Sequence, residues 1–201
     1  MFTRADFDIF DDQTLKGRLD KIYTQLDPKF EVFGVQLQAE LVVETKREFS
    51  LHIAKHLRRF KNPPMNTWMA LSESSRGYKM MPHFEVGFWD DRIFVWFALM
   101  AEMPDKTDYA LLLASQTESL LRDFADYDLS YDHMTKQKFP MSSENLKLIQ
   151  DKFAKTKKGE WLLGKVYLKD NPLFDQPEAL MADIQTTLMK MVPLYELVQT
   201  K

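Results

Sequence analysis

The stretch HFEVGFWDDRIFVWFA, residues 83–98, decides the fold. Side chains alternate in character from His83 to Trp89, and the chain returns from Arg92 as a β-rich segment that runs to Ala101. Asp90-Asp91 between them suits a two-residue turn. The pattern therefore predicts an antiparallel hairpin, and its register follows from pairing Trp89 with Arg92.

This register gives the hairpin two unlike faces. One face is wholly apolar, and we expect it to form core beneath helices: Phe84, Val86, Phe88, Ile93, Val95 and Phe97. The second face mixes aromatic and polar side chains: His83, Glu85, Gly87, Trp89, Arg92, Phe94, Trp96, Ala98 and Met100. Such a mixture is typical of an apolar-walled ligand pocket with a few placed polar groups. The alternative is that another helix covers this face, with His83 and Glu85 hydrogen-bonded at its margin.

The length of 201 residues and the order of helix and strand patterns around the hairpin predict one α+β domain with a mainly antiparallel curved sheet. We expect N-terminal helices over residues 1–43, interrupted at Asp27-Pro28. A meander of about four strands follows over residues 49–101. Helices and one later strand, Trp161 to Leu168, complete residues 105–201.

Residues 49–59 fit both a helix and a strand. We favour the strand, because Asn62-Pro63-Pro64 then connects it to the next strand. A strand here would place His52, His56 and Arg58 on one side, at the rim of the second hairpin face.

Composition excludes several classes of function. Cysteine is absent, so thiolate metal sites and cysteine nucleophiles are excluded, and a reducing cytoplasm is expected. The longest apolar run, residues 93–101, is too short for a membrane span, and the N-terminus lacks the pattern of a secretory signal. Neither GxGxxG nor a P-loop occurs. We expect no cofactor and no membrane partner. The sequence does not indicate an oligomeric state.

Charge is unevenly distributed along the chain. Residues 44–82 hold eight Lys and Arg against three Asp and Glu, whereas residues 83–134 hold three against eleven. The basic residues of 55–79, interleaved with aromatic side chains, would suit phosphates and bases. A formal net charge of −3 disfavours nucleic acid without excluding it. Solvated surface is the simplest interpretation.

Histidines raise the question of a metal site or of catalysis. His52 and His56 are four residues apart, which aligns two ligands on a helix but separates them by about 13 Å on a strand. We therefore predict no metal. His83 and Glu85 share a strand face, so an acid–base role in a hydrolase or transferase is a third hypothesis.

Several segments resemble the YktB-like family of uncharacterised bacterial proteins, most densely over residues 50–100. These segments are His52-Ile53-Ala54-Lys55-His56-Leu57-Arg58-Arg59, Asn62-Pro63-Pro64, Thr67-Trp68, Arg76-Gly77-Tyr78-Lys79-Met80-Met81-Pro82-His83-Phe84, Gly87, Trp89 and Trp96-Phe97-Ala98. The resemblance implies a bacterial cytoplasmic protein with a TATA-binding-protein-like or helix-grip-like fold. It implies no activity, and a fold does not settle a function.

The leading hypothesis is a small-molecule-binding protein whose site is the second hairpin face. We expect Phe94 and Trp96 to form apolar wall and His83 and Glu85 to orient the ligand or transfer a proton. Arg92 would anchor an anionic group, with His52, His56 and Arg58 at the rim. The alternative is a nucleic-acid- or protein-binding module that uses the basic residues 55–79.

Overall fold

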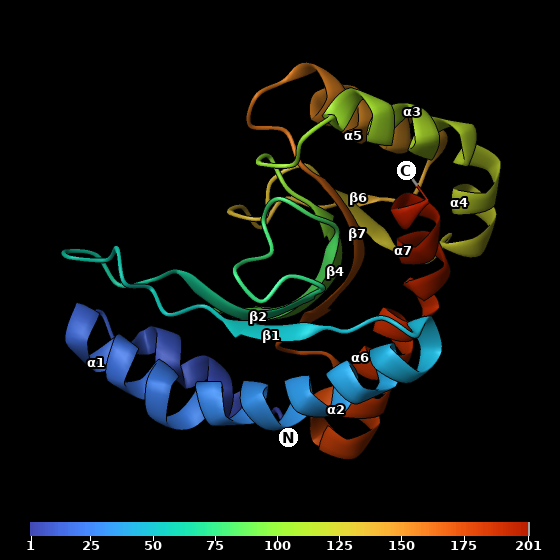
Figure 1. Cartoon of the computed structure of the whole chain (residues 1–201). Coiled ribbons are helices and arrows are strands. Elements are labelled where there is room, and N and C mark those ends of the chain that lie inside the picture. Colours follow the sequence, from blue (N-terminus) through green and yellow to red (C-terminus); the bar gives the residue numbers. More distant parts are fainter. Residues whose placement is uncertain (201) are drawn as a thin grey trace.

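A curved sheet of seven strands is the frame of the molecule, and neighbouring strands in it are antiparallel (Figure 1). The structure is a computed structural model that describes residues 1–200. The strand order is β1-β2-β3-β4-β7-β5-β6, which confirms the α+β class with a mainly antiparallel curved sheet. The strands are β1 (Ser50–Ile53), β2 (Asn66–Ser72), β3 (His83–Trp89), β4 (Arg92–Leu99), β5 (Asp128–Ser130), β6 (Phe139–Pro140) and β7 (Trp161–Leu168).

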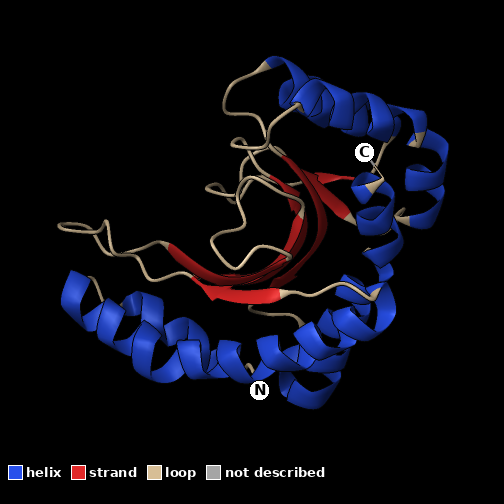
Figure 2. Ribbon diagram, viewed as in Figure 1, coloured by secondary structure: helices blue, strands red, loops and turns tan. Residues whose placement is uncertain are grey.

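Helices lie along the outer, convex side of the sheet, whereas loops occupy its concave side (Figure 2). No helix within residues 1–200 is long and apolar enough to cross a membrane. The helices are η1 (Arg4–Asp11), α1 (Leu15–Lys21), η2 (Ile22–Leu26), α2 (Asp27–Thr45), α3 (Lys106–Ser115), α4 (Thr117–Asp123), α5 (Ser143–Lys155), η3 (Pro172–Asp175), α6 (Pro177–Lys190) and α7 (Val192–Gln199).

The hairpin of β3 and β4 has the predicted register. Phe88 pairs with Ile93, and Glu85 pairs with Trp96. Six apolar side chains on its convex face are each at most 1% exposed: Phe84, Val86, Phe88, Ile93, Val95 and Phe97. Phe2 lies edge-on to Phe88, with ring centroids 5.1 Å apart. The prediction that this face forms core beneath helices is confirmed.

The N-terminal helical segment continues through Asp27-Pro28, so the predicted interruption is wrong. In the π turn η2 the backbone N–H of Asp27 donates to the carbonyl of Ile22, five residues earlier. Pro28 lies in the first turn of α2, where its missing N–H is not needed. The wider turn accommodates a proline ring that would otherwise clash with the carbonyl four residues earlier.

Residues 49–59 form only a short strand. β1 covers Ser50–Ile53, and Ala54 extends the pairing through a hydrogen bond to the carbonyl of Trp68. His56 then adopts a left-handed conformation with φ of 48°, which turns the chain away from the sheet. The prediction that His52, His56 and Arg58 share one side of a strand is therefore wrong, since the strand ends before His56.

The C-terminal half follows the predicted order with two additions. β7 has the predicted bounds, and its residues pair with β4 along its whole length. Ser142 caps α5 by accepting a hydrogen bond from the backbone of Asn145. The sequence pattern did not predict the short strands β5 and β6, which extend the sheet beyond β7. The loop between them, residues 131–138, belongs to the site described next.

Candidate functional site

The second face of the hairpin lies on the concave side of the sheet. Paired residues on adjacent strands share a face, so Glu85 lies in one row with Ala70, Trp96 and Gly164. The adjacent row contains Trp68, Gly87, Phe94 and Val166. A separate cluster of buried apolar side chains covers this face: Trp89, Phe94, Trp96, Ala98, Met100 and Leu162.

Two glycines make room for the aromatic rings of this face. A Cβ atom at Gly87 would lie 2.3 Å from Cζ of Phe94, and one at Gly164 would lie 2.8 Å from Cε3 of Trp96. The rings therefore lie over glycines of the neighbouring strands, which allows large side chains to spread over the sheet.

Loops and not a helix cover the concave face (Figure 2), so the alternative of a covered face differs from the structure only in the covering element: the face is buried and His83 hydrogen-bonds Glu85. Residues 73–82 connect β2 to β3, and residues 131–138 connect β5 to β6. Tyr78 of the first loop accepts a hydrogen bond of 2.8 Å from Nε1 of Trp68. His133 of the second loop lies edge-on to Trp68, with ring centroids 5.9 Å apart. Both loops thus contact the same tryptophan of β2.

His83 and Glu85 form a fully buried pair on β3. Nε2 of His83 lies 3.2 Å from Oε1 of Glu85, and Nδ1 lies 2.8 Å from the carbonyl of Met81. Both ring nitrogens of His83 are therefore within hydrogen-bond distance of an acceptor. Burial raises the pKa of Glu85, but the hydrogen bond and charge of His83, with the charges of His133 and Lys79, outweigh it and hold that pKa below its ordinary value.

Glu85 has unused hydrogen-bonding capacity. Glu85 is 1% exposed, and its Oε2 atom has no hydrogen-bond partner within residues 1–200. Buried polar atoms are nearly always hydrogen-bonded, and this one belongs to an ionised carboxylate.

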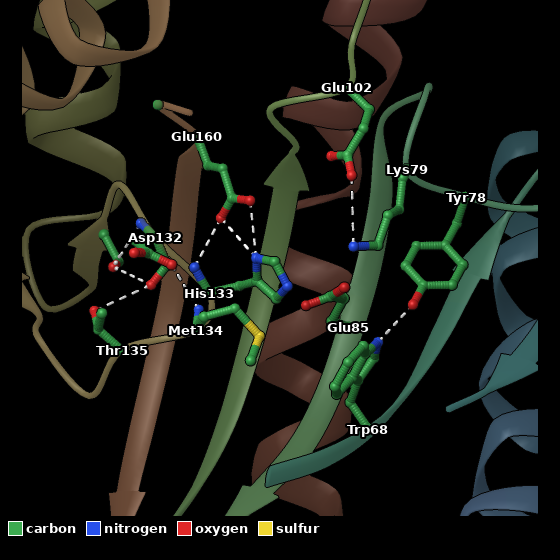
Figure 3. A network of polar contacts seen from close by, with 12 residues as sticks. Trp68, Tyr78, Lys79, Glu85, Glu102, Asp132, His133, Met134, Thr135 and Glu160 are labelled. Carbon is green, nitrogen blue, oxygen red and sulfur yellow. Dashed lines mark hydrogen bonds and ion pairs between the residues drawn. The ribbon is translucent and has the colours of Figure 1, made fainter. Parts of the chain in front are cut away.

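A second histidine–glutamate pair lies across the concave face from the first. Nδ1 of His133 is 2.8 Å from each carboxylate oxygen of Glu160, and the backbone N–H of His133 donates to Oε2 at 2.7 Å. Burial lowers the pKa of His133, but the hydrogen bond and charge of Glu160, with the charge of Glu85, outweigh it and raise that pKa. Glu85 and His133 therefore lie close enough to affect each other's ionisation, and Figure 3 shows the imidazole between the two glutamates.

Ion pairs and hydrogen bonds frame this site (Figure 3). Lys79 forms an ion pair with Glu102, with Nζ 3.6 Å from the carboxylate.

One cluster of side chains has the composition of a metal site. Its ligand atoms lie within 4.8 Å of one another and belong to Asp132, His133 and Glu160. Because Glu160 already accepts from Nδ1 and from the backbone N–H of His133, and Asp132 accepts from the backbone N–H of Met134, these hydrogen bonds account for the cluster. We assign no metal to it.

A pocket opens beside the buried pair. Its volume is about 410 Å³, and loop residues line it: Ser74, Arg76, Gly77, Tyr78, Lys79, Met80 and Met81. Tyr78 also lies edge-on to His83, with ring centroids 4.9 Å apart. The Tyr78 side chain thus separates the pocket from the His83–Glu85 pair.

The structure brings together some of the residues that the sequence indicated. His83, Glu85, Phe94 and Trp96 lie on the concave face, and the ring of His52 contacts Tyr78. His56 hydrogen-bonds Thr67 and lies edge-on to Trp68. Burial and the charge of Arg59 lower the pKa of His56 to about 4, so this ring is neutral at neutral pH.

Two predicted residues lie elsewhere. Arg92, at the turn end of the hairpin, pairs with Asp91 and donates to the carbonyl of Lys136. Arg58 lies exposed in the connection between β1 and β2. Sequence reasoning missed Tyr78, His133 and Glu160 as site residues. Asp132-His133 was visible as a dipeptide, but no spacing rule relates it to Glu160, 27 residues later.

Comparisons with known proteins agree on one family. The model of a domain of unknown function, DUF1054, matches residues 2–195. The chain belongs to this family. A UPF0637 protein of Latilactobacillus sakei is 88% identical over 201 residues and covers all of both chains. A UPF0637 protein of Lacticaseibacillus paracasei is 39% identical over 196 residues, which cover 98% of this chain and 96% of the relative.

DUF1054 membership confirms the resemblance to a bacterial family of uncharacterised proteins. The densest part of that resemblance, residues 50–100, corresponds to strands β1 to β4 and the loop that carries Tyr78. It therefore includes the His83–Glu85 pair and the pocket beside it. The family description carries no activity, so the function rests on the chemistry of the site.

Proposed function

We propose that this protein binds a small polar molecule on the concave face of its sheet, in the cytoplasm. The site lies between β3 and the loops 73–82 and 131–138. Glu85 carries the proposal, since its buried, ionised carboxylate has one oxygen without a hydrogen-bond partner among the described residues 1–200. A ligand that donates a hydrogen bond to this oxygen satisfies it.

The cost of burial supports this assignment. Transferring a carboxylate from water into a protein costs several kcal/mol unless charge and hydrogen bonds compensate. His83 offsets this cost through its contact with Oε1 of Glu85 alone. An amino or hydroxyl group of a ligand would complete the second oxygen, and an amino group would add charge complementarity.

Two further groups have hydrogen-bonding capacity left. Oη of Tyr78 accepts from Trp68, and within residues 1–200 its own hydrogen has no acceptor. Burial raises the pKa of Tyr78, so the hydroxyl keeps that hydrogen at neutral pH. Nε2 of His133 has no hydrogen-bond partner in the same part of the chain. With aromatic walls, these groups suit a small molecule that carries both donors and acceptors.

The proposal predicts a ligand-dependent rise in melting temperature that requires Glu85. At a ligand concentration 100 times the dissociation constant, binding stabilises by about 2.7 kcal/mol. For a chain of this length that shift corresponds to about 5–10 °C. A thermal-shift screen of small amines, amino alcohols and amino acids measures it.

Glu85→Gln is the decisive variant in this screen. The amide keeps an oxygen for His83 but presents an NH₂ group where the ligand's donor would bind, so the rise should vanish. Glu44→Gln, an exposed residue of α2, makes the same charge change and should keep the full shift. Equal shifts in wild type and Glu85→Gln would place the ligand elsewhere.

A second candidate function is nucleic-acid binding through the connection between β1 and β2, residues 54–65. Figure 1 shows this segment projecting beyond the sheet. The segment contains no acidic residue. In its middle, Leu57 and Phe60 are 78% and 88% exposed. Exposed aromatic and basic side chains together suit single-stranded nucleic acid. The basic residues are Lys55, Arg58, Arg59 and Lys61.

This candidate predicts salt-dependent binding of a labelled single-stranded oligonucleotide. The double substitution Arg58→Ala/Arg59→Ala removes two phosphate contacts, so the slope of log affinity against log salt should fall by about 1.4. Lys157→Ala/Lys158→Ala, two exposed cations elsewhere, serves as the matched control. No binding at low salt, or equal loss in both double variants, would contradict this function.

A further inference from the structure

We infer that the concave site is catalytic, with Nε2 of His133 exchanging a proton with the bound molecule and Glu160 positioning the imidazole. The inference rests on the proposed function and adds a reaction to it. It starts from the geometry of His133, whose second nitrogen is directed toward the side of Glu85 in Figure 3.

Glu160 holds His133 at two points. Its carboxylate accepts from Nδ1 and from the backbone N–H of the same residue. Glu160 is itself fixed, because it directly precedes β7 and its backbone N–H donates to the carbonyl of Tyr131 at 3.0 Å. A carboxylate on Nδ1 sets the tautomer that leaves the Nε2 lone pair free in the neutral ring. A base oriented by a third group is the arrangement that acid–base catalysis uses.

The other histidines lack this arrangement. Both nitrogens of His83 are engaged, by Met81 and Glu85. His52 is held by the backbone carbonyl of Ser74, and His56 by the hydroxyl of Thr67. Of the four histidines, only His133 combines a carboxylate on one nitrogen with a second nitrogen that has no partner within residues 1–200.

The charges that face His133 are suited to proton transfer. Glu160 and Glu85 favour the imidazolium, whereas burial and Lys79 oppose it, with a net rise in the pKa of the ring. An imidazole that faces two carboxylates in this way can accept a proton and return it.

The transfer is balanced within the site. Nε2 takes a proton from a water molecule as that water attacks an electrophilic carbon of the bound molecule and forms a C–O bond. The bond from this carbon to its leaving oxygen or nitrogen breaks, and the electron pair stays on the leaving atom. The imidazolium, which remains paired with Glu160, returns the proton to that atom. The substrate class is a small polar molecule whose amino or hydroxyl group is held by Glu85.

His133→Asn tests the catalytic role without disrupting the loop. The side-chain amide of asparagine places an N–H where Nδ1 donates to Glu160, but it has no atom at Nε2. The probe is the fraction below 1 kDa of a bacterial lysate, incubated with each protein and followed by mass spectrometry. Wild type should consume at least one compound that it binds, and His133→Asn should slow this by about 10²–10⁴-fold while still binding the compound.

Glu160→Gln tests the positioning role through a readout other than activity. In an NMR titration, the pKa of His133 should lie above its ordinary value in wild type and fall in Glu160→Gln, because the hydrogen bond and charge of Glu160 raise it. Glu44→Gln should leave it unchanged. An unchanged His133 pKa in Glu160→Gln would overturn the positioning role.

The outcomes separate the two proposals. A compound that both wild type and His133→Asn bind, and that neither consumes, would overturn the catalytic inference and leave the binding function intact. A compound consumed equally by both proteins would overturn it as well. If no compound binds wild type, the proposed function fails and the inference fails with it.

Discussion

Gly164→Ala is expected to destabilise the protein by about 3 kcal/mol, the upper range for overpacked sites. A Cβ atom at this position would lie 1.7 Å from the carbonyl oxygen of Val95 and 2.8 Å from the ring of Trp96. The first contact is with backbone, so no side-chain rotation relieves it. Strands β4 and β7 must separate, and they pair from Arg92 to Leu99 in the middle of the sheet.

Urea denaturation measures this loss, because the unfolding midpoint falls with stability. Val166→Ala is the matched control, since it changes a partly buried residue on the same strand and face. Removing atoms there should cost only about 1 kcal/mol. A loss below 1 kcal/mol for Gly164→Ala would mean that the two strands do not approach as closely as described.

His83→Leu is expected to cost about 3–5 kcal/mol, because it leaves the buried Glu85 carboxylate without its partner. We attribute this loss of stability to the unpaired carboxylate and not to the difference in volume between histidine and leucine. The double substitution His83→Leu/Glu85→Leu removes the buried carboxylate together with its partner and should restore most of the lost stability. A double variant as unstable as the single one would show that packing, not charge, sets the cost.

The same pair predicts how acid affects stability. Because the folded state holds the pKa of Glu85 below its ordinary value, the ionised form stabilises the protein above the pKa of the unfolded chain. This contribution is lost as pH falls through the folded pKa. Unfolding measured between pH 7 and pH 3 should therefore show a smaller acid-dependent loss in the double leucine variant than in wild type.

The hairpin was predictable from sequence because its determinants are local. Asp90-Asp91 sets the turn, and the strict alternation on both sides fixes which residues face the core, so the pairing of Glu85 with Trp96 followed. β7 was predictable for a similar reason, because Trp161 to Leu168 is rich in apolar and aromatic residues and is bounded by charged ones.

The covering of the concave face was not predictable in the same way. β5 and β6 have three and two residues, too few to show a period. The His133–Glu160 pair forms because a loop folds back onto the start of β7, and nothing in residue spacing encodes that contact. His56 turns the chain out of β1 through one left-handed residue, which pattern rules do not anticipate.

The candidate site residues were also predictable only where local sequence patterns determine their position. His83 and Glu85 were indicated by a shared strand face, and the structure shows why they matter: one carboxylate oxygen is satisfied and the other is not. Arg92 was indicated by the same alternation, but it pairs with Asp91 at the far end of the hairpin. Alternation predicts which face a residue occupies and not which neighbours it meets.

The most direct test of the central claim, that Glu85 binds a small molecule, is native mass spectrometry after equilibration with the small-molecule fraction of a bacterial lysate. We expect an added mass on wild type and on Glu44→Gln that is lost on denaturation and is absent from Glu85→Gln. The same added mass on Glu85→Gln, or none on wild type, would contradict it.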